Sequence, residues 1–133
     1  MRCMALNCCL YCNVLYVTAH GADVLFVTSP HLPSLPFLDV DTSRGKRTTQ
    51  LDLNDPADAE TLRSLVRDAD VFLQSYRPHG LAERGFGPED SAALRPGIVH
   101  ACLTGFAPGG PWGDVKSVSF SPRPPPSFVP ENE

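Results

Sequence analysis

The sequence predicts an α/β fold, with a parallel sheet and flanking helices. Short apolar runs rich in β-branched residues recur along the chain, as expected of strands buried on both faces. A long helical pattern lies between two of these runs, and glycine-containing or polar turns follow their ends. The 133 residues amount to about one domain. We therefore expect one incomplete sheet with irregular segments at both termini.

The first apolar run covers residues 22–27 (ADVLFV) and follows Gly21, so it fits a buried parallel strand. Three prolines between residues 30 and 36 then exclude regular structure, and we expect a surface loop there. A second strand is predicted over residues 48–53 (TTQLDL).

A helix is predicted to begin at Asp55, which can cap it, with Pro56 in the first helical position. Apolar residues then recur at i, i+3, i+4 and i+7 and form one stripe. These residues are Leu62, Leu65, Val66 and Ala69. A further strand over residues 70–75 (DVFLQS) completes a strand–helix–strand unit.

The remaining elements are short. A helical turn over residues 81–84 is expected to stop at Gly85, and a helix over residues 88–94 begins with a proline. Residues 98–104 (IVHACLT) form a third β-type run, followed by a glycine–proline loop over 105–112. Within the run we expect His100 to be a core or sheet-face histidine and Cys102 to be buried.

The two ends of the chain differ from its middle, so we divide it at residues 19 and 114. Residues 1–19 are an atypical cysteine-rich segment, which is a buried helix or strand or else foreign to the domain. Its apolar run is too short and too interrupted to span a bilayer, so no membrane association is expected. Residues 20–114 form the α/β region, and the proline-rich residues 115–133 are expected to be a disordered tail.

Composition excludes several function classes. The net charge of -4 disfavours nucleic-acid binding, which requires a basic surface. Four of the five cysteines lie within the first twelve residues, without the second cluster that a structural zinc site needs, so no metal is predicted. Their odd number and unpaired spacing also disfavour a secreted disulfide scaffold, which indicates an intracellular protein.

Basic and aromatic residues near the predicted strand ends suggest a ligand site. The basic groups Lys46, Arg47, Arg77 and Arg84 suit phosphate oxygens. Tyr76 and Phe106 are placed to flank an adenine ring. In open parallel sheets, ligands bind beyond the carboxyl ends of the strands. No dinucleotide-binding or P-loop fingerprint accompanies these residues.

Four blocks of the chain resemble the class III CoA-transferases, or CaiB/BaiF family, which includes formyl-CoA transferase and α-methylacyl-CoA racemase. The blocks are HGADVLFV (20–27), GKRTTQLDLNDP (45–56), ADVFLQSYRPHGLAERGFG (69–87) and LRPGIVHACLTGFAPGGPWGD (94–114). In that family they belong to the Rossmann-like part of a large domain and build much of the coenzyme A site. The resemblance covers roughly residues 20–114.

The resemblance implies that coenzyme A or acyl-CoA is the substrate and that no metal takes part. Position by position, the implied contacts are Leu51, Asp52, Leu53, Asn54, Ser75, Tyr76, Arg77, Cys102, Leu103, Thr104, Gly105 and Phe106, with Arg84 added after a one-residue shift. It further implies a homodimer for the full-length form. The implied compartment is the cytoplasm, with mitochondria or peroxisomes as alternatives.

The resemblance also implies that this chain lacks the catalytic group. The family's catalytic aspartate follows the glycine-rich loop, whereas Asp114 belongs to the loop itself. We therefore expect no catalytic residue here and a truncated, inactive relative of enzymes that transfer CoA between carboxylic acids. The alternatives are a fragment of a racemase-like isomerase, a non-catalytic CoA- or nucleotide-binding module, and a fragment without a stable fold.

Overall fold

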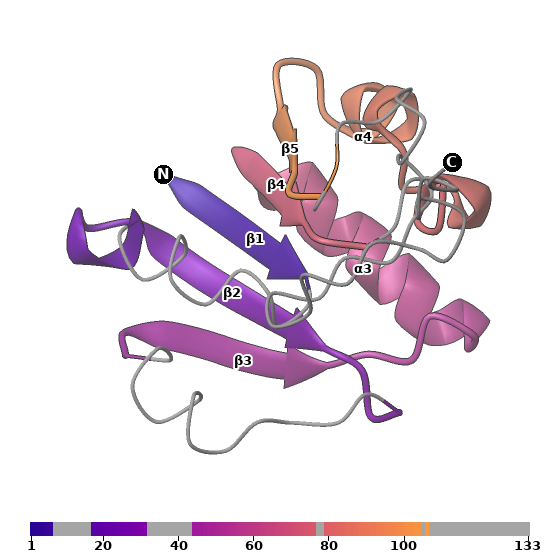
Figure 1. The fold of residues 1–133 in the computed structure, drawn as a ribbon, viewed down its shortest axis with the longest axis horizontal. Coiled ribbons are helices and arrows are strands. Elements are labelled where there is room, and N and C mark those ends of the chain that lie inside the picture. Colours follow the sequence, from indigo (N-terminus) through magenta and orange to yellow (C-terminus); the bar gives the residue numbers. More distant parts are fainter. Residues whose placement is uncertain (7–16, 32–43, 77–78, 105, 107–133) are drawn as a thin grey trace, which may run out of the picture.

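The structure, a computed structural model, describes residues 1–6, 17–31, 44–76, 79–104 and 106. Within these residues, one sheet contains five strands (Figure 1): β1 (Arg2–Leu6), β2 (Asp23–Thr28), β3 (Lys46–Gln50), β4 (Val71–Gln74) and β5 (Val99–Cys102). Their order is β3-β2-β1-β4-β5, and every neighbouring pair is parallel. The predicted α/β class, with a parallel sheet and flanking helices, is confirmed.

Strand β1 occupies the centre of the sheet. Cys3 is paired with Val24 of β2 on one side and with Val71 of β4 on the other. Because side chains alternate along a strand, Cys3 and Ala5 pack on one face and Met4 and Leu6 on the other. Burial raises the pKa of the Cys3 thiol. Of the alternatives for the opening segment, the structure shows a buried strand for residues 2–6, whereas residues 7–16 lie outside the described part.

Helix α3 (Pro56–Asp68) covers the face of the sheet that carries Met4 and Leu6. Its start is as predicted, since the Asp55 carboxylate accepts a hydrogen bond from the Ala57 N–H at 2.9 Å. The predicted apolar stripe is also confirmed. Leu62 and Val66 are fully buried, and Leu65 is half-buried against the same core. After α3 the chain enters β4, which is separated from β3 by the two strands β2 and β1.

A short helical segment and a second helix pack on the same face of the sheet as α3. The 3-10 helix η2 (Ala82–Arg84) ends at Gly85, whose φ of 76° is unfavourable for other residues. Helix α4 (Pro88–Leu94) follows, and its first turn is closed by a bond from the Gly87 N–H to the Asp90 carboxylate at 3.0 Å. Phe86, between them, is buried in the core. Both helical elements agree with the sequence-based expectation.

The amino-terminal edge of the sheet is fastened by Asp70, directly before β4. Its carboxylate accepts a hydrogen bond from the Arg2 N–H at 2.7 Å and pairs with the Arg95 guanidinium. The Asp70 N–H in turn donates to the Arg2 carbonyl oxygen at 2.9 Å. The bond from Arg2, followed by the charge of Arg95, lowers the pKa of Asp70. The starts of β1 and β4 and the residue after α4 are thereby joined.

Two predictions about the strands need correction. β3 begins at Lys46 and ends at Gln50, because the chain turns toward α3 as soon as the Leu51 N–H has bonded to the Thr28 carbonyl oxygen. Cys102 was expected to be buried and is exposed, because within the described residues β5 pairs only with β4 and Cys102 is its last residue. The tail at 115–133 and the loop at 107–112 lie outside the described residues.

His100 is a sheet-face histidine, as predicted. Its ring packs edge-on against Phe72 at a centroid distance of 5.1 Å. The hydroxyl of buried Ser91 donates to the Gly87 carbonyl oxygen at 2.8 Å, so the Nδ1–H of His100 is the donor in its 3.0 Å contact with that hydroxyl. Nε2 is then an unprotonated, buried nitrogen without a hydrogen-bond partner in the described part of the chain.

Replacing Leu62 with Ala is expected to lower the free energy of unfolding by about 2–5 kcal/mol, because it opens a cavity at a fully buried position. Leu65→Ala, on the same helix but half-buried, is the matched control and should cost clearly less. Chemical denaturation of both variants measures the difference. Equal losses would contradict the packing described for α3.

His100 should make the protein less stable as the pH falls. Burial lowers the pKa of His100, and the negative charge of Glu89 opposes this only in part. An unfolded histidine takes up a proton near about pH 6.5. Below that pH, His100 is protonated in the unfolded chain but stays neutral in the folded protein. Protonation therefore stabilises the unfolded state, and unfolding becomes more favourable.

Melting temperatures measured between about pH 7.5 and about pH 5.5 test this expectation. On acidification, the melting temperature of the His100→Gln variant should fall less than that of the parent protein. The glutamine amide can still donate a hydrogen bond to Ser91. The comparison uses the slope with pH rather than the absolute melting temperature, so a uniform loss of stability does not affect it. Identical slopes would show that His100 does not carry the effect.

Candidate functional site

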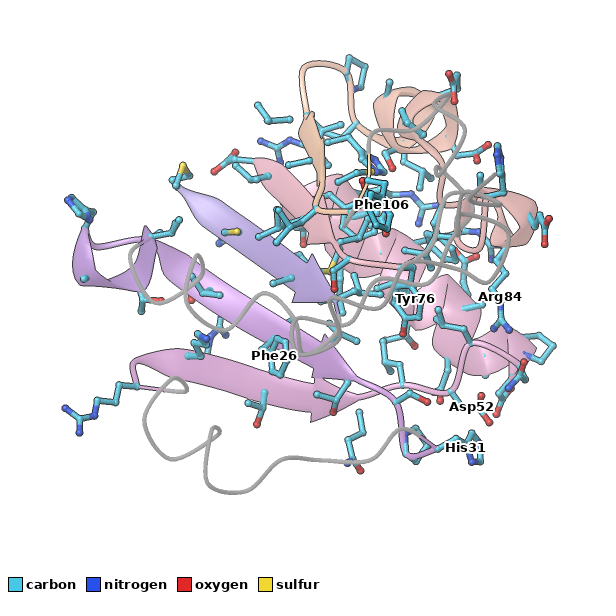
Figure 2. All side chains as sticks on the ribbon, in the orientation of Figure 1. Phe26, His31, Asp52, Tyr76, Arg84 and Phe106 are labelled. Carbon is cyan, nitrogen blue, oxygen red and sulfur yellow. The ribbon has the colours of Figure 1, made fainter. Side chains whose placement is uncertain are left out.

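The carboxyl ends of the strands meet at one edge of the sheet because all the strands are parallel. Residues that follow different strands are therefore brought together there, although they are far apart in sequence. Figure 2 shows His31, Asp52, Tyr76 and Arg84 beyond the arrowheads, on the same side of the molecule. They follow β2, β3 and β4, with Arg84 on η2.

A cleft of about 340 Å³ opens at this carboxyl edge. It is lined by Ser29, His31, Asp52, Leu53, Asn54, Tyr76, Gly80, Leu81 and Arg84. The volume is that of a small-molecule site, and the lining combines apolar side chains with a few polar and charged ones. We call it the carboxyl-edge cleft.

Asp52 organises one wall of the carboxyl-edge cleft. Its carboxylate contacts His31 Nε2 at 2.9 Å and accepts hydrogen bonds from the backbone and side-chain nitrogens of Asn54, at 3.0 and 2.8 Å. The Asp52 N–H donates to the carboxylate of Asp58, in the first turn of α3, at 2.8 Å. The Asn54 backbone bond, followed by the His31 contact, lowers the pKa of Asp52. This carboxylate is therefore ionised at neutral pH.

Arg84 contributes a positive charge from the other wall. It lies on η2, is exposed, and makes no ion pair within the described residues. Tyr76 also lines the cleft, and its backbone N–H donates to the side-chain oxygen of buried Gln74 at 2.8 Å. The amide nitrogen of Gln74 contacts the sulfur of Cys102 at 2.7 Å. Gln74 thus holds the ends of β4 and β5 together next to the cleft.

The structure gathers only part of the predicted site into the carboxyl-edge cleft. Asp52, Leu53, Asn54, Tyr76 and Arg84 line it. The side chain of Leu51 belongs to the core instead. Ser75, Cys102, Leu103, Thr104 and Phe106 follow or end strands at the same edge but are not among the lining residues. Arg77 and Gly105 lie outside the described residues.

Four lining residues were not predicted: Ser29, His31, Gly80 and Leu81. Ser29 and His31 follow β2 in a proline-rich stretch without periodicity. The rule that ligands bind beyond the carboxyl ends of parallel strands could have identified them, since β2 was predicted to end directly before them. Gly80 and Leu81 lie in the turn before η2, within the block that carries Arg84.

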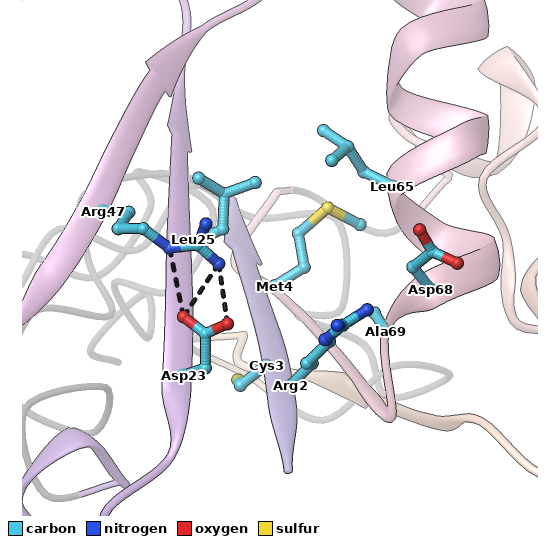
Figure 3. A pocket seen from close by; sticks show the side chains of 9 residues that line it. All are labelled: Arg2, Cys3, Met4, Asp23, Leu25, Arg47, Leu65, Asp68 and Ala69. Carbon is cyan, nitrogen blue, oxygen red and sulfur yellow. Dashed lines mark hydrogen bonds and ion pairs between the residues drawn. The ribbon is translucent and has the colours of Figure 1, made fainter.

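A second cleft, of about 320 Å³, lies at the opposite edge of the sheet (Figure 3). Its walls include Arg47 at the start of β3, which forms a two-pronged ion pair with Asp23 at 2.7 and 2.8 Å. Lys46 lies over the Phe26 ring at 5.6 Å. The prediction that Lys46 and Arg47 join Arg84 in one phosphate site is wrong, because both begin their strand while Arg84 lies beyond the strand ends.

Among the described residues, no three side chains of His, Cys, Asp or Glu gather into a group that could hold a metal ion. None of the described helices is long and apolar enough to cross a membrane.

Sequence comparisons identify relatives over most of the chain. The model of CoA-transferase family III matches residues 18–120. The succinate–glutarate CoA-transferase of Agrobacterium fabrum is 38% identical over 79 residues, which are 59% of this chain and 20% of that protein. The probable fatty acyl-CoA transferase Rv3272 of Mycobacterium tuberculosis is 30% identical over 111 residues, which are 81% of this chain and 28% of the relative.

Solved structures agree in fold. A CAIB/BAIF family protein from Brucella suis superposes with a TM-score of 0.79 at 24% identity, covering 86% of this chain and 35% of that one. Rv3272 from M. tuberculosis, in its orthorhombic form, gives a TM-score of 0.82 at 22% identity, covering 98% of this chain and 43% of that one. The chain thus spans well under half of each of these proteins.

Proposed function

Because the chain belongs to CoA-transferase family III, we propose that it binds coenzyme A or an acyl-CoA thioester in the carboxyl-edge cleft. The observation that carries this proposal is the convergence of Asp52, Leu53, Asn54, Tyr76 and Arg84 on that cleft. All five are positions to which the family resemblance assigns coenzyme A contacts. The resemblance rests on sequence and the cleft on geometry, and the two select the same edge of the sheet.

The chemistry of the cleft suits such a ligand. The planar guanidinium of Arg84 can bond two phosphate oxygens at once and has no competing carboxylate among the described residues. The Tyr76 ring and the side chains of Leu53 and Leu81 offer apolar surface to a flat base or an acyl chain. The Asp52 carboxylate and the Asn54 amide add polar groups for hydroxyls or amides.

For the whole protein we propose transfer of CoA between carboxylic acids, by analogy with the CoA-transferases among the relatives. The residues at the carboxyl-edge cleft would bind and orient the CoA portion. The resemblance assigns the group that attacks the thioester to a part of the family fold that follows the glycine-rich loop, and we propose no described residue for that role. The homodimer and the compartment implied by the resemblance remain predictions, as does the division at residues 19 and 114.

The remaining edge residues form a second part of the proposed site. We retain Ser75, Cys102, Leu103, Thr104 and Phe106 in the proposal because they follow or end β4 and β5 at the same edge of the sheet. Thr104 donates its hydroxyl hydrogen to the Phe106 carbonyl oxygen at 2.8 Å. The Ser75 hydroxyl is buried without a hydrogen-bond partner in the described part of the chain. Arg77 and Gly105 are retained in the proposal on the resemblance alone.

Isothermal titration of the purified chain with coenzyme A tests the proposal. Arg84→Ala should weaken binding by about tenfold, because it removes a charge-assisted bond to a phosphate. Arg67→Ala is the matched control: Arg67 is an exposed arginine on α3 that pairs with Glu60 at 3.3 Å and lies outside the cleft. Equal affinity of both variants would remove Arg84 from the site, and no binding by the parent chain would refute the proposed function.

A further inference from the structure

We propose that His31, held by Asp52, is a ligand-binding residue of the carboxyl-edge cleft that donates to a phosphate group only when its ring is protonated. This inference rests on the proposed function and adds to it a residue and a dependence on pH. The position of His31 in the structure carries it. Neither the family blocks nor the periodicity of the chain assigns a role to this residue.

The geometry places His31 at the cleft and fixes one of its nitrogens. The ring lines the cleft together with Tyr76 and Arg84, and its Nε2 lies 2.9 Å from the Asp52 carboxylate. The backbone N–H of His31 donates to the Ser29 hydroxyl at 3.3 Å, so these two residues after β2 are joined locally. The side chain is 66% exposed, so a ligand can reach it.

The contact with Asp52 decides what the other ring nitrogen can do. An ionised carboxylate only accepts hydrogen bonds, so Nε2 of His31 carries a hydrogen in both charge states of the ring. In the neutral ring, Nδ1 is therefore an acceptor and cannot bond to a phosphate oxygen. In the protonated ring, Nδ1 becomes a donor with a positive charge. In the neutral ring the Nδ1 lone pair repels the phosphate oxygens, whereas in the protonated ring the Nδ1–H can donate a hydrogen bond to them.

Two charged residues surround His31 in the cleft. The Asp52 carboxylate stabilises the protonated ring, and the Arg84 guanidinium would bind the same phosphate as the ring. Asp52 contacts the ring directly, and Asp58 lies behind Asp52, bonded to its N–H. Arg84 faces the same cleft from η2 and would contact the same anionic ligand. A phosphate between His31 and Arg84 would meet a donor on each wall. Asp52 serves as a positioning residue, because it acts through His31.

The probe must not titrate in the same range as histidine. A terminal phosphate such as the 3′-phosphate of coenzyme A gains or loses charge near about pH 6, which would obscure the effect. Dephospho-CoA lacks that group, and its pyrophosphate keeps the same charge between about pH 5.5 and about pH 8. Coenzyme A itself, titrated in parallel, distinguishes a contact with the 3′-phosphate from one with the pyrophosphate.

Isothermal titration with dephospho-CoA is expected to show roughly three- to tenfold tighter binding by the parent chain at about pH 5.5 than at about pH 8. His31→Gln should bind equally at both pH values, with the affinity that the parent chain has at high pH. Asp52→Asn, which keeps the size of the side chain but removes its charge, should show a smaller dependence. His20→Gln, which removes a histidine outside the cleft, should keep the full dependence.

Three outcomes are informative and distinct. If the parent chain binds neither probe at any pH, the proposed function fails. If it binds both probes but His31→Gln keeps the same pH dependence, the function stands and the role of His31 is overturned. If only coenzyme A shows a dependence that His31→Gln removes, His31 contacts the 3′-phosphate rather than the pyrophosphate. Melting curves of each variant confirm that the exposed substitutions leave the fold intact.

Discussion

Strand β1 pairs along its length with β2 on one side and with β4 on the other, and the remaining elements are arranged around it. Met4 and Leu6 provide the surface against which α3 packs, while Cys3 and Ala5 provide the opposite face. Without β1, β2 and β4 would not be joined. The carboxyl ends of β3 and β2 would then no longer lie in the same sheet as those of β4 and β5. The cleft between the residues after β3 and those after β4 therefore depends on residues that never reach it.

The two edges of the sheet use charge differently. At the amino edge the charges are paired within the protein, Asp70 with Arg95 and Asp23 with Arg47. Such exposed pairs contribute little stability individually, and their four charged groups already have partners within the protein. At the carboxyl edge, Arg84 has no anionic partner among the described residues, and the Asp52 carboxylate contacts His31 Nε2 at 2.9 Å. This asymmetry is the electrostatic reason for placing function at the carboxyl edge.

Local patterns were predictable and long-range neighbours were not. The start of α3 at Asp55 and Pro56 and its apolar stripe follow from rules that operate within one or two turns of helix. Residues 2–6 gave no comparable signal, because their sequence RCMAL contains no β-branched residue and their partner β4 lies far along the chain. Arg47 and Arg84 were grouped because both lie near strand ends, and the register of β3 separates them by placing Arg47 at the start of its strand. For the cleft, the family resemblance supplied the residues after β3 and β4. The position of Ser29 and His31 after β2 was open to prediction, whereas the contact between His31 and Asp52 joins residues that no local pattern connects.

The distance along the chain between β1 and β4 has a consequence for how the protein is made. Arg2 and Asp70, which fasten the starts of these strands, are 68 residues apart. At a synthesis rate of about 5–20 residues per second, β4 would be made roughly 3 to 14 seconds after β1. For that interval an apolar strand has one open edge, which any other extended chain could occupy. Folding of the sheet is therefore slow by topology, and its nascent state is exposed to chaperones and to mispairing.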